Sequence, residues 1–194
     1  MAYKITSSVS IEPLTVEEAK SFLRVEHSDD NGLIASLITS ARAQVESLTG
    51  LALASHSVEQ YFDSWPLNGI FSLELMPVTS IAGVYYVADG ASPGTYTTLN
   101  SSRYHTDLIS KPQRVAFNDG EQFPDLEPCM NAVKIAYTAD ATSSSEHARS
   151  LAIAKQAIRF IVAHDYERRT DPITRLNANT VRRTEQLIRQ IKMY

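Results

Sequence analysis

The stretch from Leu14 to Gly50 constrains the fold most, because it predicts two amphipathic helices joined by a short acidic turn. Thr15 and Glu18 open the first helix with the spacing of a capping box, in which each side chain accepts a hydrogen bond from the other residue's amide. Gly50 stands where a left-handed C-cap is expected. Apolar residues recur at helical spacing in the second helix: Leu33, Ile34, Leu37, Ile38, Ala41, Val45 and Leu48. Each helix has a single apolar stripe, so each needs a partner to cover it.

Two further expectations concern the first helix and the turn. Ala19, Phe22 and Leu23 share one face and form the apolar stripe of the first helix. The run 28–30, Ser-Asp-Asp, precedes the second helix and is expected to cap it, since carboxylates suit the positive end of a helix.

Composition limits the class of protein. The chain has 194 residues, 43% of them apolar, which suits one globular domain or one domain with an elaboration. A single cysteine, Cys129, excludes an internal disulfide and a cysteine-rich metal site. The apolar runs are far shorter than the roughly 20 residues of a membrane span, and the N-terminus does not resemble a signal peptide, so we expect no membrane association.

The charge is unevenly distributed along the chain. Residues 1–148 carry 8 basic and 18 acidic residues, whereas residues 149–194 carry 10 basic and 4 acidic ones, within a net charge of −4. Two interpretations remain open at this point. The charges are solvated helix faces, or the basic C-terminal part faces an acidic partner surface or nucleic acid.

After Gly50 the hydrophobic period changes from helical to alternating. Six or seven short strands follow at roughly regular spacing, which predicts an antiparallel sheet or a small barrel. The candidate strands are 58–62, 70–75, 80–87, 95–99, 103–107, 114–117 and 132–137.

The order of elements is helix, helix, strands and then helices again. It predicts an α+β fold, a helical bundle with an inserted small antiparallel β-module. The expected boundaries are a loose N-terminal arm, a bundle in two segments, the β-module, and a basic C-terminal helix that begins near Asn177 or Asn179. These parts span 1–12, 13–57 with 143–170, 58–142 and 171–194.

No pattern of residues predicts catalysis. His164 and Glu167 lie one helical turn apart, but further metal ligands are not evident, and Cys129 has no histidine near it in the sequence. Glycine-rich phosphate loops are absent. Tyr85 and Tyr86 could stack on bases, but no basic residues interleave with them. We therefore expect no enzyme activity, no cofactor and no metal.

The helical opening also resembles a known family, the head–tail connectors of long-tailed phages, also called adaptors or head-completion proteins. The matching residues are Leu14-Thr15, Glu17-Glu18-Ala19-Lys20, Leu23-Arg24-Val25, Asp29-Asp30, Leu33-Ile34, Leu37-Ile38, Val45-Glu46 and Thr49-Gly50. Weaker similarity continues at 76–81, 131–137 and 161–169, so the resemblance covers about residues 13–169.

The resemblance implies a structural virion protein. Connector subunits form a ring, here of about twelve copies, between the portal protein and the tail. The ring extends the channel through which packaged DNA passes without specific binding. The implied partners are the portal protein, further neck or tail-completion proteins and other copies of the chain. The implied location is the virion neck, after assembly in the host cytoplasm.

Two other classes of function compete with this one. A small DNA-binding protein could use the basic C-terminal helix, although the acidic remainder of the chain repels phosphate. An enzyme has no motif to support it.

The C-terminal segment contains the candidate partner-binding residues. Its narrow apolar stripe must dock either on its own bundle or on a portal or neighbouring connector subunit. We favour the partner, because arginine suits bidentate pairing with carboxylates, and we expect a chain ending after Asp171 to melt nearly unchanged. The candidates are Arg168, Arg169, Arg175, Arg182, Arg183, Leu187, Ile188, Arg189, Ile191 and Lys192.

Overall fold

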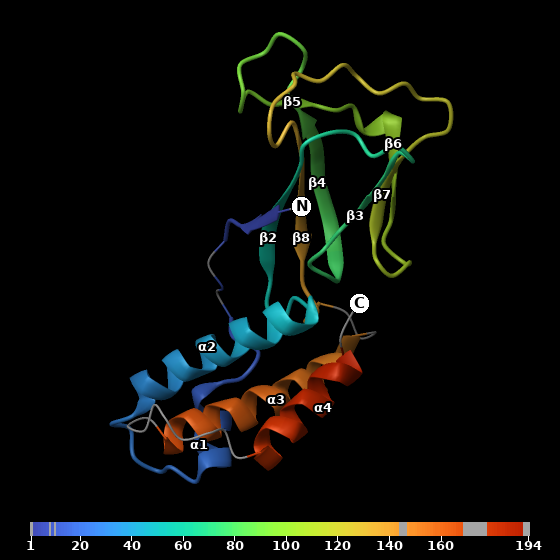
Figure 1. The fold of residues 1–194 in the computed structure, drawn as a ribbon. Coiled ribbons are helices and arrows are strands. Elements are labelled where there is room, and N and C mark those ends of the chain that lie inside the picture. Colours follow the sequence, from blue (N-terminus) through green and yellow to red (C-terminus); the bar gives the residue numbers. More distant parts are fainter. Residues whose placement is uncertain (1, 8, 10, 144–146, 169–177, 192–194) are drawn as a thin grey trace. The chain divides into compact units, whose positions relative to one another are not determined.

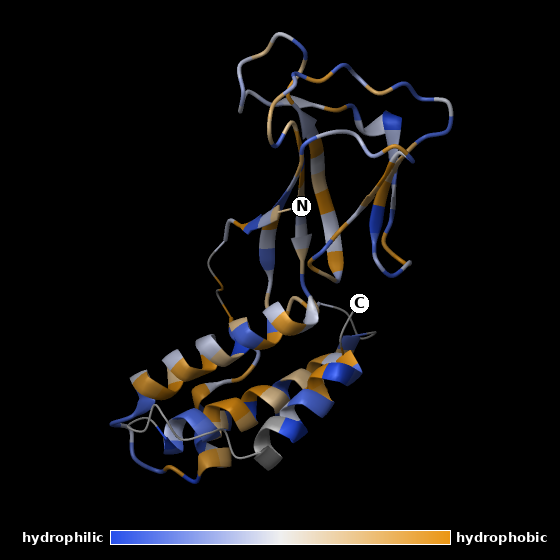
Figure 2. Cartoon of the chain, in the orientation of Figure 1, coloured by the Kyte–Doolittle hydropathy of each residue, from blue (hydrophilic) through white to orange (hydrophobic). Residues whose placement is uncertain are grey.

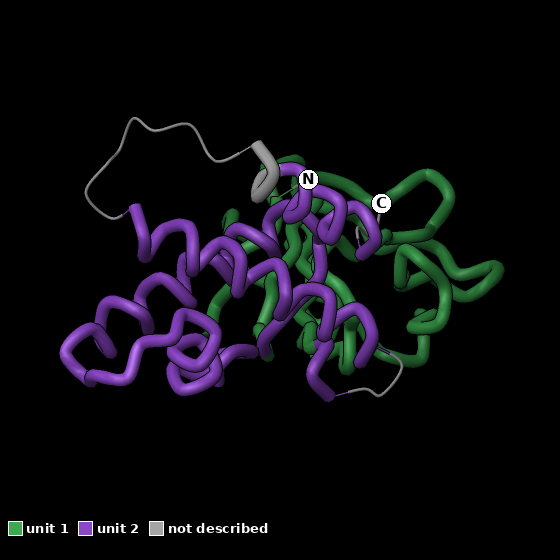
Figure 3. Tube along the Cα trace, turned by 90° about the horizontal axis from the view of Figure 1, so that it is seen from below, with its two compact units in different colours: residues 1–8, 55–140 green, residues 9–54, 141–194 purple. Residues whose placement is uncertain are grey.

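The computed structural model describes residues 2–7, 9, 11–143, 147–168 and 178–191 (Figure 1). The chain divides into two compact units (Figure 3). The β-unit consists of residues 1–8 and 55–140, and the helical unit consists of residues 9–54 and 141–194. The predicted α+β class is confirmed.

The β-unit contains two antiparallel sheets, where the sequence predicted one sheet or a barrel. The larger sheet has the order β1-β2-β8-β4-β5, with β1 at Ala2–Ile5, β2 at His56–Phe62, β8 at Val133–Ala139, β4 at Val78–Tyr86 and β5 at Thr97–Thr98. The smaller sheet has the order β3-β7-β6, with β3 at Ile70–Ser72, β7 at Arg114–Phe117 and β6 at Tyr104–Asp107. A 3-10 turn, Ser101–Arg103, precedes β6.

The central pair of the larger sheet buries one face. Strands β2 and β8 pair along their full length, from His56 opposite Ala139 to Phe62 opposite Val133. Gln60 is fully buried in β2, and its amide is satisfied by Ser72 O at 3.1 Å and by the Glu74 amide at 3.1 Å. A buried glutamine needs such partners, since an unpaired polar group would lower stability.

Trp65 is the centre of an aromatic cluster in the β-unit. Its ring contacts four other aromatic rings at centroid distances of 5.1 to 6.0 Å, those of Phe71, Tyr86, Phe117 and Phe123. Its indole Nε1 donates to Pro124 O at 2.8 Å. The only tryptophan of the chain is therefore a reporter of the β-unit.

The expected loose N-terminal arm is wrong for residues 2–5. These residues form the edge strand β1 and pair with β2, from Ala2 opposite Tyr61 to Ile5 opposite Val58. The Thr6 amide continues the ladder to Ser57 O at 2.8 Å. Strand β1 has only four residues and all of its side chains are exposed, so hydrophobic alternation could not identify it.

The described residues of the helical unit form four helices: α1 at Val16–Leu23, α2 at Asn31–Thr49, α3 at Ala148–Glu167 and α4 at Ala178–Ile191. Helix α3 packs against the other three, and in Figure 2 it is coloured mostly as hydrophobic. Its buried residues Ala154, Ala157, Ile158 and Val162 meet the predicted stripe of α2. Leu48 of that stripe is 49% exposed and lies outside the core.

The helix ends follow the sequence signals only in part. The capping box of α1 is confirmed, with both hydrogen bonds present between Thr15 and Glu18, and Gly50 has the predicted left-handed φ of +70°. Asp30 occupies the N-cap position of α2, but its side chain makes no capping hydrogen bond. Its carboxylate instead accepts a 2.5 Å hydrogen bond from the hydroxyl of Tyr166, which fastens the start of α2 to the end of α3.

A buried ion cluster holds α2 to the segments on either side of it. Arg42 and Glu46, both under 10% exposed, pair at 2.5 Å between Nη1 and Oε2. Arg42 Nε also donates to Glu12 Oε2 at 2.7 Å, and Glu46 Oε1 accepts from the Leu53 amide at 2.8 Å. These bonds fasten the chain before α1 and the chain after α2 to one helix.

Candidate partner-binding surfaces

The apolar side of α4 packs on its own bundle. Ile188 and Ile191 are buried, at 9% and 3% exposed, and Leu187 is half-buried against the core of the helical unit. These three residues were predicted to bind a partner, and the structure corrects that role. Packing against α3 and α2 covers Ile188 and Ile191 and part of Leu187, so little of this apolar surface is left for a partner.

The basic side of α4 is exposed. Arg182, Arg183 and Arg189 face away from the core, and the Arg183 guanidinium lies 5.6 Å from the centroid of the Phe160 ring. Arg168 is half-buried as the C-cap of α3. The remaining predicted residues lie outside the described residues: Arg169, Arg175 and Lys192. The exposed arginines remain candidates for a partner.

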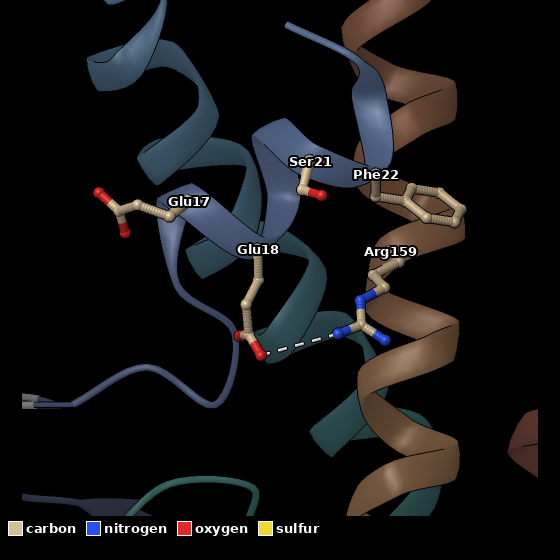
Figure 4. Close-up of a pocket in the computed structure, with 5 residues that line it drawn as sticks. All are labelled: Glu17, Glu18, Ser21, Phe22 and Arg159. Carbon is tan, nitrogen blue, oxygen red and sulfur yellow. Dashed lines mark ion pairs between the residues drawn. The ribbon is translucent and has the colours of Figure 1, made fainter. Parts of the chain in front are cut away.

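A groove opens beside α1 and α3 (Figure 4). It has a volume of about 580 Å³ and is lined by Glu17, Glu18, Ser21, Phe22 and Arg159. Glu18 Oε1 and Arg159 Nη2 are 3.7 Å apart across it, whereas Glu17 points away from Arg159. Phe22 is 40% exposed, which corrects its predicted place in the apolar stripe.

Aromatic packing fixes Phe22 beside the groove. Its ring meets Phe160 of α3 edge-on, with the centroids 5.9 Å apart. An exposed aromatic residue that is already ordered can contact a partner with little further loss of side-chain entropy. The groove is therefore one candidate surface on the helical unit, and it includes an exposed acidic residue, Glu17.

The tip of the β6–β7 hairpin is one exposed apolar position on the β-unit. Ile109 is 93% exposed at this tip, and Lys111 beside it is exposed as well. Asp107 Oδ1 accepts from the amides of Ile109 and Ser110 at 3.1 and 3.0 Å. Hydrogen bonds from Ser110 and then from Arg114 hold the pKa of Asp107 well below its usual range. The carboxylate is therefore charged and keeps the tip ordered.

One face of the larger sheet gathers tyrosines around a lysine. Lys134 Nζ lies 5.1 Å from the ring centroid of Tyr85 and 4.7 Å from that of Tyr96. It also pairs with Glu59 Oε1 at 2.9 Å. Tyr85 and Lys134 are cross-strand partners, far apart in the sequence, so the basic residue near Tyr85 could not be predicted from its neighbours. Because Glu59 neutralises the lysine, this face does not favour phosphate.

Glu59 also sets the titration of Tyr61. The Tyr61 hydroxyl donates to Glu59 Oε2 at 2.6 Å and this bond raises the pKa of Tyr61 to about 12. At a pH between the usual tyrosine pKa of about 10 and the raised pKa of about 12, Tyr61 stays protonated in the folded chain but has lost its proton in the unfolded chain. The hydrogen bond to Glu59 therefore contributes fully to stability below about pH 10, and its contribution declines as the pH rises further. We expect Glu59→Gln to move the Tyr61 pKa back toward its usual value.

An NMR titration of the tyrosine rings, assigned with Tyr61→Phe, measures this shift. Asp63→Asn, which removes an exposed carboxylate of the same unit, serves as the control and should leave the Tyr61 pKa raised. A wild-type Tyr61 that ionises with an ordinary pKa would contradict the hydrogen bond to Glu59.

Two absences hold for the described residues. Among them no group of three or more His, Cys, Asp or Glu side chains is placed to hold a metal ion. His164, considered above for a metal, instead has its Nδ1 3.1 Å from Asp165 Oδ1. Within the same part of the chain, no helix is both long and apolar enough to cross a bilayer.

The α+β fold is similar to that of chains in solved structures of the neck and virion of a gene transfer agent (GTA) particle. A chain in a structure titled "Neck of empty GTA particle computed with C6 symmetry" aligns with a TM-score of 0.74 and 20% identity, covering 96% of this chain and 95% of that one. A chain of the virion of the native gene transfer agent (GTA) aligns at 0.72 and 20%, over 96% and 95%. A third, from the native neck computed with C12 symmetry, aligns at 0.68 and 20%, over 96% and 94%.

The sequence of the helical opening is similar to a known family. Residues 13–69 match the model of the phage gp6-like head–tail connector proteins, which confirms the predicted resemblance to head–tail connectors. No curated protein matches the chain. The matched residues include α1 with its capping box, and α2.

Proposed function

We propose that this chain is a structural subunit of a head–tail connector, which forms a ring between the portal and the tail and extends the DNA channel. The observation that carries the proposal is the likeness of nearly the whole chain to neck proteins, together with the connector match at residues 13–69. A fold similarity at 20% identity supports the architecture, and the family match supports the role.

A ring needs surfaces through which copies meet. The neck structures computed with C6 and C12 symmetry contain chains whose folds are similar to that of this chain. Their symmetry favours a cyclic arrangement for this chain as well. The portal protein and further neck or tail-completion proteins are the proposed partners above and below the ring. Its proposed location is the neck of the virion, after assembly in the host cytoplasm. The role is mechanical, so no catalytic step belongs to it.

Imaging of virions from the phage that encodes the chain tests this function. We expect electron microscopy to show a cyclic layer of this protein at the neck, and deletion of its gene to leave filled heads without tails. Complementation with the intact gene should restore tailed particles. Location of the protein in the capsid shell or at the tail tip would contradict the proposal.

A DNA-binding protein would give a different result in a simpler assay. The exposed Arg182, Arg183 and Arg189 would then retain duplex DNA, with an affinity that falls steeply as salt rises. The proposed connector lets DNA pass without specific binding, so duplex DNA should not be retained at physiological salt.

A further inference from the structure

The chain contains two asparagine–glycine pairs, Asn31-Gly32 and Asn68-Gly69, and the structure gives them different surroundings. An asparagine before glycine can lose its side-chain amide spontaneously, because glycine has no side chain to hinder attack by its own backbone nitrogen. The first pair belongs to the first turn of α2, whereas the second lies in the turn that precedes β3. The two pairs therefore allow a comparison of one chemistry in two settings.

The turn around Asn68 supplies a hydrogen-bond donor to the oxygen that this reaction would charge. The Ile70 amide donates to Asn68 Oδ1 at 3.2 Å. When a backbone nitrogen attacks Cγ, negative charge develops on this oxygen, and a fixed donor stabilises it, as the donors of an oxyanion hole do in enzymes. Asn68 is also exposed, so water can reach the product of the attack.

The turn also controls when the Gly69 nitrogen is available. Gly69 has a φ of +68°, in the left-handed region that favours glycine. Its amide donates to Pro66 O at 2.9 Å and so closes the turn. The nitrogen is released for attack only when this bond breaks. We therefore expect the reaction to be slower in the folded chain than in an unfolded chain, where the bond is absent.

The side-chain oxygen of Asn31 has neither the exposure nor the donor found at Asn68. Asn31 Oδ1 is buried, and within the part of the chain that the structure describes it has no hydrogen-bond partner. Asn31 also begins α2, where the backbone has a ψ of about −42°. Ring closure changes this angle and would open the first turn of the helix. The reaction at Asn31 is therefore expected to be much slower.

We propose that Asn68 is a site of spontaneous modification, at which asparagine is converted to aspartate and isoaspartate. The Gly69 nitrogen forms a bond to Cγ of Asn68, the Cγ–Nδ2 bond breaks, and Nδ2 leaves as ammonia with the proton that the Gly69 nitrogen gives up. Water then opens the cyclic imide, adding its hydroxyl to one carbonyl carbon and a proton to the nitrogen. Addition at Cγ gives aspartate. Addition at the backbone carbonyl carbon gives isoaspartate, in which the chain continues through the side chain.

The two products differ in their effect on the β-unit. Aspartate keeps an oxygen that accepts from the Ile70 amide, and it adds a negative charge to an exposed turn. Isoaspartate instead lengthens the backbone immediately before Gly69, whose carbonyl accepts from the Phe117 amide at 3.0 Å. The Trp65 ring lies 5.1 Å from the Phe117 ring between centroids, so tryptophan fluorescence is expected to report isoaspartate and not aspartate.

Peptide mapping by mass spectrometry tests the proposal on full-length protein stored at mildly alkaline pH. Conversion at Asn68 is expected to exceed conversion at Asn31 by at least about tenfold, since one oxyanion donor is worth about 10²–10³ in enzymes. In urea-unfolded protein the two asparagines should react at similar rates. Equal conversion of both in the folded chain overturns the proposal. So does a product at Asn68 that contains aspartate without isoaspartate, because direct hydrolysis of the amide gives aspartate alone.

Trp65 fluorescence gives a second readout with two matched variants. Freshly purified Asn68→Asp carries the added charge on a normal backbone, and its spectrum should equal that of fresh wild type. Asn68→Ser cannot form the cyclic imide, so its spectrum should stay constant during storage while that of wild type changes. A spectrum that changes equally in stored Asn68→Ser would overturn the assignment of the effect to Asn68.

Discussion

Replacing Arg42 by alanine is expected to destabilise the helical unit by about 3–5 kcal/mol, because it leaves a buried carboxylate without its cation. Glu46 is 7% exposed, and Arg42 supplies its charged partner at 2.5 Å. The same substitution releases Glu12, which Arg42 holds through Nε. Urea unfolding followed by far-ultraviolet circular dichroism, which is dominated by the helices, measures the loss.

A double variant separates the cost of the unpaired charge from the cost of lost packing. Arg42→Met with Glu46→Gln removes both charges, and the glutamine oxygen can still accept from the Leu53 amide. We expect it to be clearly more stable than Arg42→Ala, since replacing a buried ion pair as a whole costs much less than breaking it. Arg24→Ala, at an exposed arginine of the same unit, should change stability little. Equal losses in Arg42→Ala and the double variant would contradict the argument.

Ending the chain after Asp171 is expected to lower the melting temperature of the helical unit strongly, which reverses the expectation from the sequence. The truncation removes Ile188 and Ile191 from the bundle core and exposes the apolar side of α3 that α4 covers. Ile191→Ala alone is expected to cost about 2–5 kcal/mol, the range for truncating a buried isoleucine. Thermal unfolding by far-ultraviolet circular dichroism measures both effects.

Trp65 provides the internal control for this experiment. Its fluorescence reports the β-unit, so the two units can be followed separately in one sample. Gln190→Ala changes an exposed residue of the same helix and should be close to neutral. If the truncated chain melted as the full chain does, α4 would contribute nothing to the bundle and its apolar side would be available to a partner, as the sequence suggested.

The features that the sequence predicted correctly are those that neighbouring residues determine. A capping box needs only Thr15 and Glu18, and a left-handed C-cap needs only Gly50. Strands β2 and β8 alternate between buried and less buried positions, and the strands in the range 56–139 were located to within a few residues. The resemblance to connectors also rested on local residues of the helical opening, and the family match covers that stretch.

The features that the sequence could not predict depend on distant parts of the chain. Strand β1 exists because β2 offers it an edge, and Asp30 pairs with Tyr166 across 136 positions instead of capping its own helix. Phe22 shares the spacing of a core residue, yet α1 is short and Phe160 meets only the edge of its ring. The α1–α3 groove could not be predicted for the same reason, because its lining residues come from both ends of the chain.

The pairing of β2 with β8 has a consequence for the order of folding. The helical unit is made of two segments separated by residues 55–140, and bringing the ends of so long a loop together is entropically costly. Once β2 and β8 have paired, His56 stands opposite Ala139, and the Ala141 amide reaches Ala52 O at 2.9 Å. The pairing of these strands therefore keeps the residues that follow α2 close to the residues that precede α3. The β-unit is therefore expected to form early, and the four helices assemble on a chain whose long loop is already closed.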